Sequence, residues 1–262
     1  MKDRILFCGD PHSRFRHIIE ATERMQPMAV VLLGDMEPLR PLHIELESIS
    51  KKTEIWLIHG NHDTDWSNEQ KRECIHFDHI WLSTLSDRNI HGRVIELPNG
   101  TRLAGLGGVF RTSVWDPRLP LPAFRSRAEH AKSTPRQDRW NGSVHARHWS
   151  TIYPDELNKL ADQRADILVT HEAPGYHNYG FEILDDLARS LGAKVTVHGH
   201  QHDSLDSSDR WQQQGFKSFG VGLRGITAID ANGNAEVIVP GELDAQRDHR
   251  QKYLDVLKDD KL

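Results

Sequence analysis

Five short apolar runs in this 262-residue chain end in the same way, with a small residue next to a side chain that can bind a metal ion. Brief aliphatic runs of this kind are typical of buried strands in a parallel sheet. In open α/β sheets, ligands bind beyond the carboxyl ends of the strands. We therefore expect the five ends to converge along one rim, and they read Gly9-Asp10-Pro11-His12, Gly34-Asp35, Gly60-Asn61-His62-Asp63, Thr170-His171-Glu172 and His198-Gly199-His200-Gln201-His202.

The segments between these runs predict an alternation of strands and helices. Apolar residues recur at helical spacing in Arg14–Met25 and Leu39–Ser50, which predicts a β-α-β-α-β beginning. Asn99-Gly100 predicts a tight hairpin turn, because this pair accepts positive φ values. The expected strands are Arg4–Cys8, Ala29–Leu33, Ile55–Ile58, Ile90–Leu97, Thr101–Leu106, Asp166–Thr170, Lys194–His198, Lys217–Val221, Ile226–Ile229 and Ala235–Val239. The later expected helices are Asp155–Gln163, Phe181–Leu191 and Leu243–Leu257.

The composition favours a soluble cytoplasmic protein with no membrane partner. Charged residues make up 27% of the chain, and no apolar stretch is long enough to cross a membrane. The first apolar run stops at Asp10, which is too early for a signal peptide. The two cysteines, Cys8 and Cys74, do not suggest a disulfide framework. We expect a single domain over residues 1–262, interrupted by one insertion.

That insertion, Arg111–Ser150, is rich in proline and has no clear period. It holds eight Arg or Lys against three Asp or Glu, a net charge of +5 in a chain whose total is -5. One interpretation is a solvated loop. The other is a lid or wall that presents positive charge and aromatic rings to an anionic substrate, either a nucleotide or single-stranded nucleic acid. The side chains that would do so are Arg125, Arg127, Arg136, Arg139, Trp115, Phe124, Trp140 and Trp149.

The residue types at the five strand ends indicate a metal site. Carboxylates, imidazoles and one amide oxygen, with no cysteine, suit Mn, Fe or Zn. Asp10 and His12 are two residues apart and can reach one ion, whereas His200 and His202, at the same spacing, can each face a different ion. Asp35 stands in the middle of the set and is a natural bridge between two cations. Each block alone is compatible with a plain turn or a hydrogen-bonded histidine, so the prediction depends on the joint set.

Together the blocks resemble the signature of the calcineurin-like metallophosphoesterases. That signature runs D-x-H, GD, GNH followed by D or E, a distant H, and GHxH, and all of its elements are present here in this order. The first three blocks lie about 25 residues apart, as β-α-β units require. The resemblance covers about residues 5–202. It implies an α/β fold of two packed mixed β-sheets flanked by helices, a four-layer αββα sandwich.

The resemblance also implies a division of roles at the site. The first metal would be held by Asp10, His12, Asp35 and His202, and the second by Asp35, Asn61, His171 and His200. Mn is the first choice of metal, with Fe or Zn as alternatives. Two such cations about 3.5–4 Å apart clamp a phosphate and turn a bridging water into a hydroxide nucleophile. His62 would then stabilise or protonate the departing oxygen, and Asp63 would orient His62.

Residues around the blocks have alternative interpretations. His59 and His198 are expected to support ligands or to pack in the core, and Glu172 and Asp203 adjoin ligands in the same way. Two residues are candidate substrate contacts, with an ordinary loop or structural role as the alternative: Tyr176 and Arg224.

The predicted function is binuclear metal-dependent hydrolysis of phosphate esters, as a phosphodiesterase or phosphomonoesterase acting on a phosphorylated small molecule or a nucleotide. The phosphoprotein phosphatase branch is disfavoured by Ser13, Met36–Arg40 and Asp63, which depart from its D-x-H-G, GD-x-x-DRG and GNHE motifs. A nuclease is the alternative enzyme and depends on the basic insertion alone. A binding scaffold without activity is disfavoured because His62 and the full ligand set are present.

Overall fold

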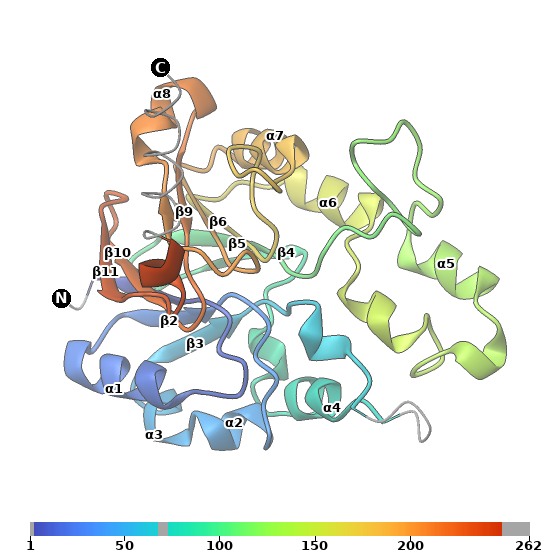
Figure 1. The fold of residues 1–262 in the computed structure, drawn as a ribbon, viewed down its shortest axis with the longest axis horizontal. Coiled ribbons are helices and arrows are strands. Elements are labelled where there is room, and N and C mark those ends of the chain that lie inside the picture. Colours follow the sequence, from blue (N-terminus) through green and yellow to red (C-terminus); the bar gives the residue numbers. More distant parts are fainter. Residues whose placement is uncertain (1–2, 68–72, 248–262) are drawn as a thin grey trace.

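The computed structural model describes residues 3–67 and 73–247, and it consists of two packed β-sheets between two layers of helices (Figure 1). The first sheet has the strand order β11-β10-β1-β2-β3, and the second has the order β4-β5-β6-β7-β9-β8. Strands β1, β2 and β3 are parallel, as are β5, β6, β7 and β9, while β4, β8, β10 and β11 pair antiparallel. The four-layer mixed-sheet fold expected from the sequence is confirmed.

The strands lie where the apolar runs predicted them, within a few residues. The first sheet contains β1 (Ile5–Cys8), β2 (Ala29–Leu32), β3 (Glu54–Leu57), β10 (Ile226–Ile229) and β11 (Ala235–Val239). The second contains β4 (Arg93–Glu96), β5 (Arg102–Leu106), β6 (Ile167–Thr170), β7 (Val195–His198), β8 (Leu205–Asp206) and β9 (Lys217–Gly220). Among these strands only β8 was not expected, because two residues are too few to show an apolar period.

The helices agree less closely with the sequence pattern. They are α1 (Arg16–Met25), α2 (Leu42–Glu45), α3 (Glu47–Ser50), α4 (Ile75–Trp81), α5 (Arg127–Ser133), α6 (Pro154–Ala161), α7 (Glu182–Leu191) and α8 (Trp211–Gln214). The helix expected at Leu39–Ser50 is broken at Leu46, and α5 and α8 were not anticipated. Of the expected helix Leu243–Leu257, residues 244–247 are helical and the rest lies outside the described residues. None of the helices described is long and apolar enough to cross a membrane.

The core explains why the strands read as continuous apolar runs. In β1, Ile5 and Phe7 lie between the two sheets, while Leu6 and Cys8 face the helices on the outer side. Both faces of the strand are therefore buried, which requires apolar residues at every position. On the other side of the sandwich, α6 and α7 pack their apolar faces on the second sheet.

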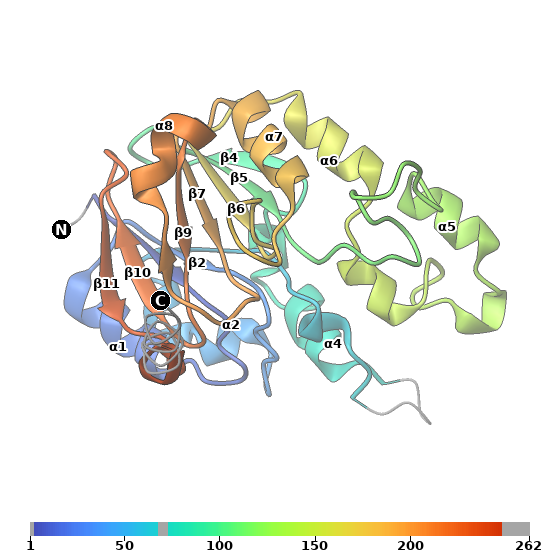
Figure 2. The ribbon, with the colours of Figure 1, turned by 45° about the horizontal axis from the view of Figure 1, so that its top comes forward.

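The insertion projects from one edge of the sandwich beside α4 and α6 (Figures 1 and 2). Its base is closed by backbone hydrogen bonds, from Val109 N to Ser150 O at 2.8 Å and from Ile152 N to Val109 O at 3.0 Å. Between these ends the chain forms α5 and the 3₁₀ turns η3 (Arg136–Asp138) and η4 (Ala146–Ser150). We call residues 111–150 the insert.

Candidate metal centre

The five sequence blocks meet at one end of the sandwich, where the strands of both sheets finish. β1, β2 and β3 of the first sheet lead into the blocks of Asp10, Asp35 and Asn61, and β6 and β7 of the second lead into those of His171 and His200. The expectation of one continuous rim was therefore wrong. The side chains approach from two facing sheets, so they can surround a small volume instead of lining an edge.

Two groups of three side chains bring their ligand atoms within 4.8 Å of one another. The first group is His12, Asp35 and His202, and the second is Asp35, His171 and His200. Asp35 belongs to both. This is the arrangement expected of one carboxylate shared by two cations.

Asp10 and Asn61 border these groups. The Asp10 carboxylate accepts a hydrogen bond from the backbone N–H of His200 at 2.9 Å, and its Oδ1 lies 3.8 Å from Nδ1 of His171. Oδ1 of Asn61 lies 3.2 Å from Nε2 of His171. All seven predicted ligands are thus within reach of a common centre.

The hydrogen bonds of His171 indicate whether the ligand atoms of the centre are arranged to bind a cation. Nδ1 of His171 is 2.7 Å from the carbonyl oxygen of Leu33, which can only accept, so Nδ1 carries the hydrogen. Nε2 then faces Oδ1 of Asn61, 3.2 Å away, and Oδ2 of Asp35, 3.4 Å away, and the high pKa of this ring means that a proton on Nε2 takes the place of a cation there. Three electron-rich atoms in such proximity repel one another unless positive charge lies among them. The site therefore fits a cation.

His12 shows the same pattern on the other side of Asp35. Its Nδ1 is hydrogen-bonded to the carboxylate of Glu37, and its Nε2 lies 3.3 Å from Nε2 of His202. A carboxylate outside the ligand set fixes the ring so that the second nitrogen faces inward. The sequence reasoning missed Glu37, although it stands only two residues after Asp35.

The pKa values of the group reflect this crowding. Burial lowers the pKa of His171, but the Asp35 carboxylate beside it outweighs burial and raises that pKa to about 10. Burial raises the pKa of Asp10 to about 7. Burial and the charge of His171 lower the pKa of His200 to about 3, and burial and His12 lower that of His202 to about 4. The centre attracts positive charge, and His200 and His202 are neutral, as metal ligands must be.

The backbone carries strain at the same place. Non-glycine residues with positive φ are uncommon and collect at functional sites. Several residues of the centre adopt such angles: Asp10 (38°), His12 (40°), Asp35 (46°), Glu37 (44°), His200 (66°) and His202 (59°). The surrounding sheets hold these residues in place.

Two glycines allow the loops to come this close. Gly34 has φ 102°, and a Cβ atom there would lie 2.5 Å from Nδ1 of His171. A Cβ atom at Gly60 would collide with the Asp35 carboxylate. The small residue at these two positions is thus required by the packing of the ligands themselves.

His62 lies beside the ligand groups, and its side chain is 45% exposed. Its backbone N–H donates to Oδ1 of Asp35 at 2.8 Å, and its Nδ1 lies 2.8 Å from Oδ2 of Asp65. The hydrogen bond to Asp65 is the main reason that the pKa of His62 rises to about 9. The His62 ring also lies against that of His12, with ring centroids 5.5 Å apart.

The expectation that Asp63 orients His62 was wrong. The Asp63 carboxylate is fully buried and accepts hydrogen bonds from the backbone N–H groups of Met36, Glu37 and Gly60, at 2.8, 2.9 and 2.8 Å. It ties the loop after β2 to the loop after β3. Asp65, three residues after His62 across the 3₁₀ turn η1 (His62–Thr64), takes the orienting role instead.

Two predicted substrate contacts have structural partners. Arg224 donates to the carbonyl oxygen of Pro11 at 3.2 Å and forms an ion pair with Glu242 at 2.5 Å, so its charge is already neutralised. The hydroxyl of Tyr176 is 2.7 Å from Nε2 of the buried His198. Both side chains thus have partners within the protein, in the loops that surround the centre.

The four arginines of the insert that were predicted to contact the substrate do not line the pocket beside the centre. Arg127 pairs with Glu156 at 2.9 Å and donates to the carbonyl oxygens of His148 and Trp149, so it is a structural residue. Arg139 donates to the carbonyl oxygen of Thr134 at 2.9 Å. Arg125 and Arg136 are exposed. Of the four aromatic side chains, only Phe124 lines a pocket near the centre, next to two arginines that were not singled out, Arg111 and Arg147.

The other neighbours of the blocks behave as expected of supporting residues. Oε2 of Glu172 lies 3.8 Å from Nε2 of His200, and its Oε1 accepts from the backbone N–H of Phe110. Asp203 pairs with Arg247 at 3.1 Å, and the buried His59 packs against His91.

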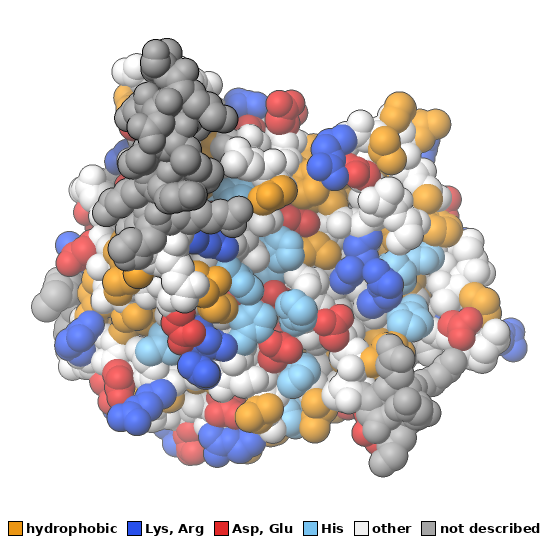
Figure 3. Space-filling model, in the orientation of Figure 1, with side chains coloured by type: hydrophobic (Ala, Val, Ile, Leu, Met, Phe, Trp, Pro, Cys, Tyr) orange, Lys and Arg blue, Asp and Glu red, His pale blue; other side chains and the backbone are white. Residues whose placement is uncertain are grey.

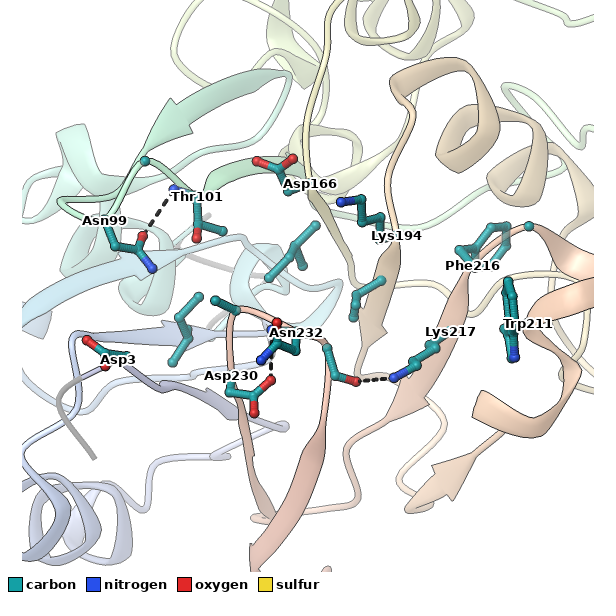
Figure 4. A pocket seen from close by; sticks show the side chains of 17 residues that line it. Asp3, Asn99, Thr101, Asp166, Lys194, Trp211, Phe216, Lys217, Asp230 and Asn232 are labelled. Carbon is teal, nitrogen blue, oxygen red and sulfur yellow. Dashed lines mark hydrogen bonds between the residues drawn. The ribbon is translucent and has the colours of Figure 1, made fainter.

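A second cavity, of about 600 Å³, lies at the opposite end of the sandwich (Figure 4). It is formed where β6, β7 and β9 begin, and its side chains include Asp166, Lys194 and Lys217. Lys217 donates to the carbonyl oxygen of Gly233 at 3.0 Å. No histidine is among the described residues that line it, so the converging metal-binding groups belong to one end of the strands only.

The paired groups of cation-binding side chains at the strand ends of two packed sheets form a candidate metal centre. Residues 3–204 match the family model of the calcineurin-like phosphoesterases. The chain belongs to this family and thus to the class of metal-dependent phosphoester hydrolases.

Other comparisons agree with this assignment. An uncharacterized protein of Haemophilus influenzae is 37% identical over 230 residues, which cover 88% of this chain and 95% of the relative. A structure from Thermus thermophilus has a TM-score of 0.56 at 14% identity, covering 91% of this chain and 99% of its own. A dimetal phosphatase from Danio rerio has a TM-score of 0.53 at 12% identity, covering 93% and 97%. The two structures show a shared fold.

Proposed function

We propose that this chain hydrolyses phosphodiesters or phosphomonoesters of small molecules with two divalent cations, with Mn as the first choice and Fe or Zn as alternatives. The observation that carries the proposal is the position of Asp35, whose carboxylate belongs to both groups of ligand atoms. His12, His202 and Asp10 would complete one site, and His171, His200 and Asn61 the other. Mixed carboxylate and imidazole ligands suit these metals.

When bound, the two cations supply Lewis acidity and lower the pKa of water. The residues of the chain do the rest. Asp10, Asp35 and the inward-facing imidazoles hold positive charge where the phosphate must bind. His62 presents Nε2 to the ester oxygen that departs and donates a proton to it, while Asp65 holds the Nδ1 hydrogen and fixes the ring.

The test is hydrolysis by purified, metal-free protein to which Mn²⁺, Fe²⁺, Zn²⁺ or Mg²⁺ is added back. The substrates are p-nitrophenyl phosphate and bis(p-nitrophenyl) phosphate, so the rates distinguish a monoesterase from a diesterase. We expect turnover that depends on metal and saturates near two ions per chain. Binding of two ions without hydrolysis of either ester would contradict the proposal.

A further inference from the structure

Beside the candidate metal centre lies a pocket of about 1090 Å³ that the insert forms with the turn after His62. Figure 3 shows this face: histidine and acidic side chains gather at its middle, and a group of basic side chains with further histidines lies next to them on the side of the insert. We call it the arginine pocket, and it is lined by Asp65, Trp66, Arg111, Phe124, His130, Ser133, Thr134, Pro135, His145, Arg147 and His148.

Two arginines of this pocket lack counter-ions among the described residues. Arg111 is half-buried, and its guanidinium donates to Oγ of Ser150 at 3.3 Å. Within residues 3–67 and 73–247, Nε of Arg111 is buried with no hydrogen-bond partner. Arg147 is exposed, and in the described part of the chain no carboxylate forms an ion pair with either arginine. By contrast, Arg118 and Arg127 of the same insert are both paired.

Both guanidinium groups belong to residues that line the arginine pocket, and they are close enough for their charges to interact. Burial lowers the pKa of Arg111, and the charge of Arg147 lowers it further, whereas Asp65, Glu172 and Asp35 act in the opposite direction. Arg111 is half-buried and its Nε has no hydrogen-bond partner among the described residues, so an anion bound beside it would supply the missing partner. The pocket is therefore suited to an anionic ligand.

A chain of hydrogen bonds connects this pocket to the catalytic turn. Arg111 donates to Oγ of Ser150, and Oγ of Ser150 is 2.6 Å from Oγ1 of Thr64. Thr64 belongs to η1, the turn that begins with His62. Asp65, which orients His62, itself lines the pocket. The arginine pocket therefore adjoins the turn that carries His62.

The remaining wall suits a flat polar ring. Phe124 stacks on His130 with ring centroids 4.2 Å apart, and Trp66 donates from Nε1 to Nε2 of His145 at 3.2 Å. Burial, the largest cause, lowers the pKa of His130 and takes that of His148 to about 3, so these rings are neutral. Aromatic rings and the hydroxyl groups of Ser133 and Thr134, beside two arginines that form no ion pair in the described structure, suit the base and phosphate of a nucleotide.

We infer that the arginine pocket binds a nucleotide unit of the substrate, with a phosphate on Arg111 and Arg147 and the base against the wall of Phe124 and Trp66. This inference rests on the proposed function, in which a different phosphate is cleaved at the metal centre. The substrate is accordingly a small molecule with at least two phosphate groups, one of them carried by a nucleoside.

The experiment measures inhibition of p-nitrophenyl phosphate hydrolysis by adenosine 3′,5′-bisphosphate and by adenosine 5′-monophosphate. The wild-type chain should bind the bisphosphate about tenfold more tightly or better, since a charge-assisted contact of this kind is worth about 1.5–3 kcal/mol. Arg147→Gln and Arg111→Gln should each reduce this preference about tenfold. Arg136→Gln, which removes the same charge from an exposed position of the insert, should retain it.

Calorimetric titration of the bisphosphate into the same three variants separates the two hypotheses. If the chain hydrolyses no ester, but the bisphosphate binds and binding weakens with Arg147→Gln, the proposed function fails and the pocket stands. If hydrolysis occurs and Arg147→Gln binds both nucleotides like Arg136→Gln, the inference is overturned. It is also overturned if a 5′-phosphorylated single-stranded oligonucleotide competes far more tightly than the bisphosphate, because the ligand is then nucleic acid.

Discussion

The candidate metal centre and the arginine pocket adjoin each other but are built in different ways. The centre stands on strand ends of two sheets, and its buried carboxylates Asp10 and Asp63 are held by backbone N–H groups. The arginine pocket stands on turns and short helices of the insert, and in the described structure its charged groups Arg111 and Arg147 lack counter-ions. In the proposed function, the rigid scaffold would hold the reaction chemistry, and the loops would carry the groups that select a substrate.

The largest effect is expected for Asp35→Ala. Because this carboxylate belongs to both ligand groups, its loss should remove both metals and reduce turnover on the order of 10⁴-fold or more. Elemental analysis of the purified variant checks this directly. Asp65→Asn is the matched control, since Asp65 lies outside both ligand groups and should leave the metal content unchanged. Two bound ions in Asp35→Ala would refute the bridging role.

A smaller loss is expected for His62→Ala, which should retain its metals and lose on the order of 10²–10⁴-fold in kcat. Asp65→Asn should lose about 10–100-fold, because it keeps the imidazole but weakens its orientation. The substrate must have a poor leaving group, such as an alkyl phosphate, since p-nitrophenolate departs without a proton. Equal rates for wild type and His62→Ala on an alkyl phosphate would exclude a proton donor at this position.

These two expectations depend on a candidate site whose side chains the sequence predicted to lie together, as they do in the structure. The ligands follow buried strands, and a strand end with a small residue and a polar one is a local pattern. His62 and Asp35 were found in this way. What local pattern cannot show is the partner of each side chain: Asp63 follows His62 directly, yet it turns into the protein and binds three backbone N–H groups. Asp65 reaches His62 only because η1 brings positions three apart together.

Removal of the metals should lower the thermal stability of the wild-type chain. Asp10, Asp35 and Asp63 are almost completely buried, and without cations their charges are less well compensated. At a metal concentration about 100 times the Kd, binding contributes about 2.7 kcal/mol, which corresponds to a Tm shift of about 5–10 °C for a domain of this size. Scanning calorimetry with and without EDTA measures it. Asp35→Ala should show no such shift, and a shift of wild-type size in that variant would place the stabilising ions elsewhere.

The smallest expected effect is a difference in the free energy of unfolding between variants of Arg127 and Arg136, two arginines of the insert that the sequence analysis treated alike. Arg127→Ala should destabilise the fold by about 1–3 kcal/mol, because Glu156 and two carbonyl oxygens lose their partner. Arg136→Ala should change the free energy of unfolding by no more than about 0.5 kcal/mol, since its side chain is exposed. Urea denaturation measures both values. Equal stability of the two variants would show that the pairing of Arg127 is unimportant.

The insert shows the limit of composition as a guide. Its excess of positive charge was evident from the sequence, but the four arginines singled out for substrate binding are not those that line the pocket. Arg111 and Arg147 are 36 residues apart (147 − 111) and meet only because the ends of the insert return to the same place. Such a contact is tertiary, so neither periodicity nor spacing reveals it.

The closed base of the insert has a consequence for how such proteins diversify. The chain leaves the sandwich at Val109 and rejoins it at Thr151, and these two residues form a parallel bridge. A segment with adjacent ends can be lengthened, shortened or exchanged without moving the strands on either side. Evolution can therefore replace the whole segment as one cassette, and a protein engineer can do the same. A transplanted segment would bring its own ligand preference to an unchanged catalytic scaffold.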